Sequence, residues 1–239
     1  MPRSGSLGAR KRAPQKNAAK PRTAVTAHAG SLHTRANTPE SFKAALAFPI
    51  DYLEADVRFT PENEAYLSHD PVPVPLQRNA MRLKELLKLV ASLPKVRLNL
   101  DMKEYSGIGE MAALVKRSRM STRVIMTGIG RDAVSRVRGS ADGLPYLLNA
   151  RPNLWQRHTA PGAAALARTI LACGALGLNA HHLFVTRRLT RVLAKAGLSV
   201  SVWTVDGERE MRRFLSIPVD NITTNRVDVL LALRNGRTR

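Results

Sequence analysis

The sequence contains one cysteine, few acidic residues and no long apolar run, and each shortage excludes a class of protein. A lone Cys173 cannot form an intramolecular disulfide framework or a cysteine metal site, which favours a reducing compartment, and we expect a cytoplasmic protein. The nearest approach to a membrane span, Gly162–Leu178, is interrupted by Arg168, so no transmembrane helix is predicted. Only 18 Asp and Glu residues oppose 38 Lys and Arg residues, and the net charge is +20. This excess favours polyanionic partners: nucleic acid, anionic lipid or phosphate-bearing substrates.

Part of the positive charge lies in residues 1–22, which carry seven cations and no acid among Gly, Ser, Pro and Ala. The remainder, residues 23–239, keeps 31 cations against 18 acids, a net charge of +13. Residues 1–22 have no apolar periodicity, and we expect a disordered basic tail that makes non-specific contacts with polyanions or anionic membranes. The tail has no apolar core of the secretory type, while its arginine-rich, acid-free composition is also that of an organelle transit peptide.

After the tail, short apolar runs alternate with amphipathic stretches. The predicted strands are Ala24–His28, Asp51–Val57, Val96–Asp101, Arg123–Met126, Leu144–Leu148, Ala175–Leu178, Ser199–Thr204 and Asp220–Thr223. The predicted helices are Pro39–Ala47, Ala80–Ala91, Gly109–Arg117, Arg131–Val137, Pro161–Cys173, Arg187–Ala196, Glu208–Leu215 and Val227–Leu233. Eight strand–helix pairs predict an α/β fold, a single-domain TIM (β/α)8 barrel over residues 23–239. A doubly wound open sheet is the alternative, because periodicity alone does not separate the two.

The stretch Asp51–Asp70 contains two carboxylates, Glu54 and Asp56, two residues apart on a predicted strand. Side chains alternate along a strand, so both point to one face. Carboxylates held together in an apolar setting need a cation, and Mg²⁺ and Ca²⁺ prefer oxygen ligands. An isolated pair of this kind is more often part of a surface-facing polar strand edge, so the choice between that and a metal site depends on the rest of the sequence.

Several other reactive residues also lie at the ends of predicted strands. In a TIM barrel, the active residues lie at the C-terminal ends of the strands. Residues at or next to such ends are His28, Glu54, Asp56, Asp101, Lys103 and Trp203, and His69 and Asp70 follow a short extra strand at Ala65–Ser68. The barrel interpretation therefore places all of them on one rim.

Six segments carry a resemblance to a known family. They read AHAG (27–30), ANTPESF (36–42), YLEADVRFT (52–60), LSHDPVP (67–73), LNLDMKE (98–104) and VWTVDGEREMRRFLSIPVDNITTN (202–225). In order and spacing they resemble the glycerophosphodiester phosphodiesterases and their phospholipase D-like toxin relatives, which are built on a TIM barrel.

The resemblance implies a role for each matching residue. His28 and His69 become the acid–base pair, and Glu54, Asp56 and Asp101 become ligands of Mg²⁺ or Ca²⁺. Lys103 becomes a cation beside the phosphate, and Trp203 an apolar wall for the alcohol portion of the substrate. Asn37, in the loop after the first strand, is a candidate for positioning a ligand or a metal-bound water. The four remaining histidines, His33, His158, His181 and His182, have no such support and are expected to be structural or surface residues.

The sequence also departs from the family pattern. Ala29 stands where the family usually has an arginine, which removes a bidentate phosphate contact, and Arg58 or Arg151 is a candidate replacement. Ala36 replaces a glutamate, Asp101 a longer glutamate, and Asn225 an aspartate. The segment 71–82 is short where the family inserts a longer lobe, which predicts an open mouth and bulkier substrates.

Both histidines and all three carboxylates remain, and we therefore expect an active, metal-dependent phosphoric diester hydrolase. The expected substrates are glycerophosphodiesters or related lipid-headgroup compounds such as lysophospholipids, cleaved to an alcohol and a glycerol phosphate. Two alternatives stay open: a phospholipase D-like lyase that forms cyclic phosphates, and a non-catalytic barrel that binds polyanions through its basic surface. The sequence does not indicate an oligomeric state.

Overall fold

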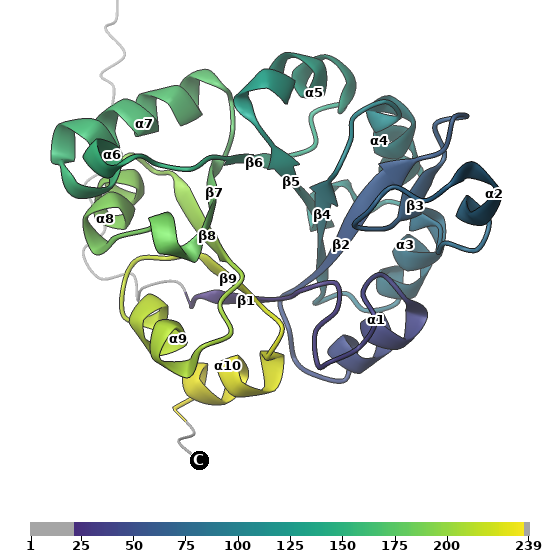
Figure 1. The fold of residues 1–239 in the computed structure, drawn as a ribbon, viewed down its shortest axis with the longest axis horizontal. Coiled ribbons are helices and arrows are strands. Elements are labelled where there is room, and N and C mark those ends of the chain that lie inside the picture. Colours follow the sequence, from purple (N-terminus) through teal and green to yellow (C-terminus); the bar gives the residue numbers. More distant parts are fainter. Residues whose placement is uncertain (1–21, 237–239) are drawn as a thin grey trace, which may run out of the picture.

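The structure, a computed structural model, describes residues 22–236 and shows a ring of strands surrounded by helices (Figure 1). The strands are β1 (Ala24–Ala27), β2 (Tyr52–Phe59), β3 (Ala65–Leu67), β4 (Arg97–Met102), β5 (Val124–Ile129), β6 (Tyr146–Asn149), β7 (Gly177–His181), β8 (Ser199–Trp203) and β9 (Asn221–Thr224). The α-helices are α1 (Pro39–Leu46), α2 (Val74–Gln77), α3 (Leu83–Ala91), α4 (Ile108–Arg117), α5 (Val134–Ser140), α6 (Leu154–His158), α7 (Ala160–Ala172), α8 (Arg187–Lys195), α9 (Glu208–Leu215) and α10 (Val227–Arg234). Short 3₁₀ turns occupy η1 (Ser121–Arg123), η2 (Arg131–Ala133) and η3 (His182–Phe184).

The sheet closes on itself. Its order is β1-β9-β8-β7-β6-β5-β4-β2-β3, and β1 also pairs with β2. All neighbouring pairs are parallel except β2–β3, so β3 is an antiparallel addition and eight parallel strands form the ring. The predicted TIM barrel is confirmed, and the open-sheet alternative is excluded because an open sheet would have left β1 and β2 unpaired with each other.

Each parallel strand is covered on both faces. In β4, Leu98 and Leu100 are fully buried towards the helices, while Asn99 and Asp101 point into the ring. The apolar core therefore lies between the strands and the helices. The interior of the ring is polar, which leaves it available for chemistry.

The strand boundaries differ from prediction at one place that matters for the site. The sequence predicts that the second strand ends at Val57, but β2 continues to Phe59 because residues 57–59 pair with β3. Glu54 and Asp56 thus lie within the strand and are 3% and 2% exposed. The short helices α2 and α6 were not predicted, since four or five residues are too few to show helical periodicity.

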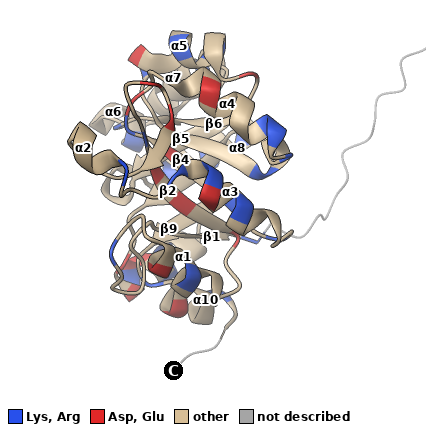
Figure 2. Cartoon of the chain, turned by 90° about the vertical axis from the view of Figure 1, so that its right-hand side faces the viewer, with Lys and Arg blue, Asp and Glu red and all other residues tan. Residues whose placement is uncertain are grey.

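Charge lies mainly on the outside of the barrel. Figure 2 shows Lys and Arg on the outer surfaces of helices such as α3 and α5. The predicted disordered tail lies, apart from Arg22, outside the described residues. Within residues 22–236, no helix has both the length and the apolarity needed to cross a membrane.

Candidate active site

A cavity of about 440 Å³ opens at the C-terminal ends of the strands. Its walls include six of the predicted site residues: His28, Glu54, His69, Asp101, Lys103 and Trp203. The remaining two are buried and do not line this cavity: Asp56 contacts Lys103 of the wall, and Asn37 contacts Asp56. The structure therefore brings together residues that are up to 175 positions apart in the sequence (His28 and Trp203).

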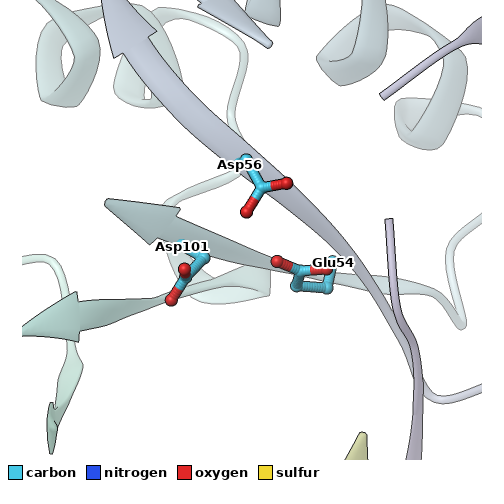
Figure 3. Close-up of side chains that lie close together, drawn as sticks. All are labelled: Glu54, Asp56 and Asp101. Carbon is cyan, nitrogen blue, oxygen red and sulfur yellow. The ribbon is translucent and has the colours of Figure 1, made fainter. Parts of the chain in front are cut away.

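Three carboxylates form the centre of the site (Figure 3). Glu54 and Asp56 come from β2, and Asp101 comes from the neighbouring strand β4, where it pairs directly with Asp56. One oxygen from each carboxylate lies within 4.8 Å of the others. Carboxylate oxygens at this spacing suit a hard divalent cation, so the donor set fits Mg²⁺ or Ca²⁺.

The electrostatics of Glu54 point to the same need for a cation. Burial, and then repulsion by Asp56 and Asp101, raise the pKa of Glu54 well above its ordinary value. The main-chain N–H of Ala29 donates a hydrogen bond of 2.7 Å to Glu54 Oε2 and partly opposes this rise. A small residue at position 29 is completely buried against the cluster, which explains how a main-chain group approaches so closely.

Lys103 supplies the positive charge that lies nearest to the cluster. Its Nζ is 2.9 Å from Asp56 Oδ1 and 2.5 Å from Asp101 Oδ2. Burial lowers the pKa of Lys103, but the attraction of Asp101 and Asp56 outweighs it, and the net pKa is raised. The ammonium therefore stays charged at neutral pH and neutralises part of the cluster.

Asn37 fixes the position of Asp56. Its Nδ2 donates to Asp56 Oδ2 at 2.7 Å, and its Oδ1 accepts from the Asp56 main-chain N–H at 3.0 Å. Asn37 has φ of 60°, a left-handed conformation that asparagine tolerates better than most residues. The amide therefore acts on Asp56 and does not face the cavity.

The two predicted histidines both line the cavity, but their surroundings differ. His28 follows β1, is half-buried, and is held by its main-chain N–H donating to Thr224. The His69 side chain is 64% exposed, and its Nδ1 lies 2.9 Å from Asp70 Oδ1. A carboxylate beside Nδ1 orients the ring.

Arg58 supports the loop that carries His69. Its guanidinium donates from Nε and Nη2 to the main-chain oxygen of His69, at 3.1 and 2.9 Å, and pairs with Glu104 at 3.2 Å. Glu104 in turn accepts from the main-chain N–H of Phe59. Arg151, the other candidate for a phosphate contact, lies over the ring of Phe184 at 4.4 Å and is not part of the cavity wall.

The cavity also contains residues that the sequence interpretation missed. Thr127 lies 2.7 Å from Asp101 Oδ1, and Asn149 Oδ1 accepts from the main-chain N–H of Gly128 and from Asn179 Nδ2. These polar residues lie in or at the ends of β5, β6 and β7, so the rule used for the other strands would have found them. Position 128 requires glycine for its backbone, because its φ of +75° is left-handed and a Cβ would lie only 2.3 Å from the main-chain oxygen of Met102.

Comparison with known proteins places this geometry in a family. The model of the Glycerophosphoryl diester phosphodiesterase family matches residues 72–229, about two thirds of the chain. The chain belongs to this family. As a glycerophosphodiester phosphodiesterase family member it is a phosphoric diester hydrolase, as the sequence predicts. The match begins after His28, Glu54, Asp56 and His69, so their roles depend on the geometry above.

Individual relatives agree with the assignment. The chain is 27% identical to a Mycobacterium tuberculosis protein described as "Probable glycerophosphodiester phosphodiesterase 2", over 85% of this chain and 88% of the relative. The structure resembles that of a glycerophosphodiester phosphodiesterase from Parabacteroides distasonis, with a TM-score of 0.73, 19% identity, and coverage of 92% and 100% of the two chains. It also resembles an Oleispira antarctica phosphodiesterase in complex with the product sn-glycerol-3-phosphate, with a TM-score of 0.69, 16% identity, and coverage of 89% and 96%. At these identities the two structures establish the barrel fold.

Proposed function

We propose that the protein hydrolyses glycerophosphodiesters, or related lipid-headgroup phosphodiesters, to an alcohol and a glycerol phosphate. The observation that carries the proposal is the composition of the cavity wall. Two imidazoles, His28 and His69, share one cavity of about 440 Å³ with two carboxylates of the Glu54–Asp56–Asp101 cluster and with Lys103. The sn-glycerol-3-phosphate bound by the Oleispira antarctica phosphodiesterase supports a glycerol phosphate product here.

Glu54, Asp56 and Asp101 would hold one Mg²⁺ or Ca²⁺. When bound, such an ion neutralises the phosphate and the negative charge that grows on its oxygens in the transition state. The raised pKa of Glu54 supports this role, because the clustered carboxylates are short of positive charge when Lys103 is their sole neighbouring cation among the described residues. Lys103 is placed to donate to a phosphate oxygen at the edge of the cluster.

The histidines carry the proton transfers. One imidazole removes a proton from the attacking oxygen as that oxygen forms a bond to phosphorus. The other donates a proton to the departing alcohol oxygen as its bond to phosphorus breaks. The attacking oxygen belongs either to water or to a neighbouring hydroxyl of the glycerol, and in the second case a cyclic phosphate forms first and is then hydrolysed. Trp203, 37% exposed at the cavity wall, provides an apolar surface for the alcohol portion.

Phosphorus NMR tests the function directly. Purified protein is incubated with glycerophosphocholine, glycerophosphoethanolamine and lysophospholipids, in Mg²⁺, in Ca²⁺ and in a chelator. We expect a phosphomonoester signal that requires the metal and is lost in His28→Ala but not in His158→Ala, which removes an exposed histidine from α6. A cyclic phosphate that persists would replace the hydrolase by a lyase, and turnover in His28→Ala equal to that of the unmodified protein would refute the acid–base assignment.

A substrate with a good leaving group separates the two histidines. A p-nitrophenyl phosphodiester releases an anion that needs no protonation, so loss of the general acid costs little with this substrate. We expect one of His28→Ala and His69→Ala to recover most of its activity, and the other to stay impaired by about 10²–10⁴-fold. Equal impairment of both variants on both substrates would contradict a division into one acid and one base.

A further inference from the structure

An apolar and cationic rim lies beside the mouth of the cavity. Among the described residues, eight large hydrophobic side chains are exposed, and six of them belong to segments that follow or end strands at the mouth. These six are Val74 and Leu76 on α2, Leu154 and Trp155 on α6, Leu183 on η3, and Trp203 at the end of β8. Figure 2 shows α2 and α6 towards the same end of the barrel, at the left of the view, while Figure 1 shows them on opposite sides of the ring. Exposed apolar side chains that gather on one surface mark an interaction site, and those of α6 and η3 are the ones that lie together.

The α6 and η3 residues form one continuous surface with the cavity. Trp203, in the cavity wall, makes an edge contact with His181 at 5.3 Å, and the His181 ring lies 5.9 Å from Phe184. Phe184 in turn lies under the guanidinium groups of Arg151 and Arg157, at 4.4 and 5.3 Å. A row of ring contacts therefore extends from the cavity wall to Arg151 and Arg157.

Hydrogen bonds hold α6 and η3 together. Arg157 Nη1 donates to the main-chain oxygen of Leu183 at 3.1 Å, and Thr186 Oγ1 donates to the main-chain oxygen of Arg157 at 2.5 Å. These bonds join the segments that carry three exposed side chains into one unit. The three are Leu154, Trp155 and Leu183, which are 67%, 52% and 64% exposed. We name this unit, residues 151–158 with 182–187, the mouth rim.

The segment of the chain that carries the mouth rim has charges of one sign. No Asp or Glu occurs from residue 143 to residue 205, a run of 63 residues that contains seven Lys and Arg residues. This run forms β6, β7 and β8 with α6, α7 and α8, which pack against one another at the left of Figure 1. Arg151 and Arg187 are exposed at the mouth rim itself. The sector has no carboxylate of its own, although Asp206 and Glu210 of the next segment lie close enough to His182 to act on it. The excess of arginine and lysine therefore favours anionic surfaces.

We propose that the mouth rim docks on an anionic lipid surface, with Leu154, Trp155 and Leu183 inserted among the lipids and the arginines facing the headgroups. Leucine and tryptophan suit the boundary between headgroups and acyl chains, and binding there grows with the apolar area buried and with attraction to anionic lipid. A nucleic acid would satisfy the arginines but not the exposed leucines. A lipid surface satisfies both, and the mouth of the cavity then faces the membrane.

Vesicle sedimentation of the full chain tests the proposal, with vesicles of phosphatidylcholine alone or mixed with phosphatidylglycerol. The test variant is Leu154→Ser/Leu183→Ser. The matched control is Leu171→Ser/Leu176→Ser, which removes the two exposed leucines of the same acid-free sector that lie away from the mouth, at 55% and 52% exposure. Neither variant changes a charge, and both keep residues 1–21, so electrostatic binding by the basic tail is the same in both.

We expect the unmodified protein and the control to bind phosphatidylglycerol vesicles within twofold of each other, and the test variant to bind at least tenfold more weakly. Trp155 and Trp203 are the two tryptophans of the chain, and both lie at this surface, so their fluorescence should shift to shorter wavelength on vesicles. Equal binding by the test and control variants would show purely electrostatic attachment and would overturn the proposal. Absence of binding to phosphatidylglycerol vesicles would also overturn it. The proposal would fail as well if the protein bound DNA more strongly than vesicles and the test variant kept both kinds of binding. Because no readout requires turnover, these outcomes are independent of the proposed hydrolysis.

Discussion

Asn37 offers the sharpest test of how the carboxylate cluster is held. Replacing it by Ala removes the donor to Asp56 Oδ2 and the acceptor for the Asp56 main-chain N–H, which are bonds of 2.7 and 3.0 Å. Asp56 is 2% exposed, so water cannot readily replace either partner. A bond to a charged group contributes about 1.5–3 kcal/mol and a neutral bond about 1 kcal/mol, so their loss costs about 3 kcal/mol.

The left-handed backbone at position 37 adds a cost of its own, of about 1–2 kcal/mol for residues other than glycine and asparagine. Asn63→Ala is the matched control, because Asn63 has φ of 64° and its described hydrogen bond is a main-chain bond to Thr60. Subtracting the effect of the control isolates the bonds to Asp56.

Thermal unfolding and metal titration provide the measurement. A loss of about 3 kcal/mol should lower the melting temperature by about 6–12 °C beyond the control, since 1 kcal/mol corresponds to about 2–4 °C in a domain of this size. The variant should also need a higher concentration of Mg²⁺ or Ca²⁺ for half-maximal activity, because Asp56 is no longer oriented. A melting temperature equal to that of Asn63→Ala, with unchanged metal dependence, would refute the role assigned to Asn37.

Three further changes test the remaining parts of the site. The pKa of Glu54 is raised in the folded state, so ionised Glu54 lowers the stability of the fold above that pKa, and this cost vanishes below the unfolded-state pKa. Glu54→Gln should therefore raise the melting temperature in chelator at pH 7–8, and the gain should disappear as the pH falls towards 4. A gain that persists at pH 4 would contradict this. Lys103→Met should lower kcat by about 10²–10³-fold and destabilise the metal-free protein, because Asp56 and Asp101 lose their counter-charge. Added divalent cation should restore the melting temperature of this variant, and an unchanged kcat would show that Lys103 is not part of the site. Arg58→Gln should lower kcat with little change in KM, because the guanidinium holds the main-chain oxygen of His69, whereas a rise in KM alone would show that Arg58 binds the phosphate.

The sequence predicts the barrel well because its signals are local. Each parallel strand turns apolar side chains towards the helices, as Leu98 and Leu100 do in β4, and each helix has an amphipathic period. All eight predicted strands and eight predicted helices overlap observed elements. The end of β2 was predicted two residues too early because it depends on β3, a partner that periodicity within β2 does not report.

The site was predictable where a motif and a strand end coincide, and less so elsewhere. His28, His69 and the three carboxylates were identified in this way, and the structure brings them together. The relation between Asn37 and Asp56 was not predictable, because the two are 19 residues apart and meet only when a loop folds over the strand. The mouth rim was also missed, since exposure of Leu154 and Leu183 is decided by tertiary packing and not by their immediate neighbours.

The closure of the barrel has a consequence for the order in which the protein can fold. β1 is held between β2 and β9, and His28 is bonded through its main-chain N–H to Thr224, 196 residues later. Arg234 further joins the end of the chain to Thr23 and Asp51. During synthesis, the first strand therefore waits for the last before the ring can be completed. The carboxylate cluster can form on β2 and β4 early, but the position of His28 beside it depends on a contact with Thr224, which is synthesised 196 residues later.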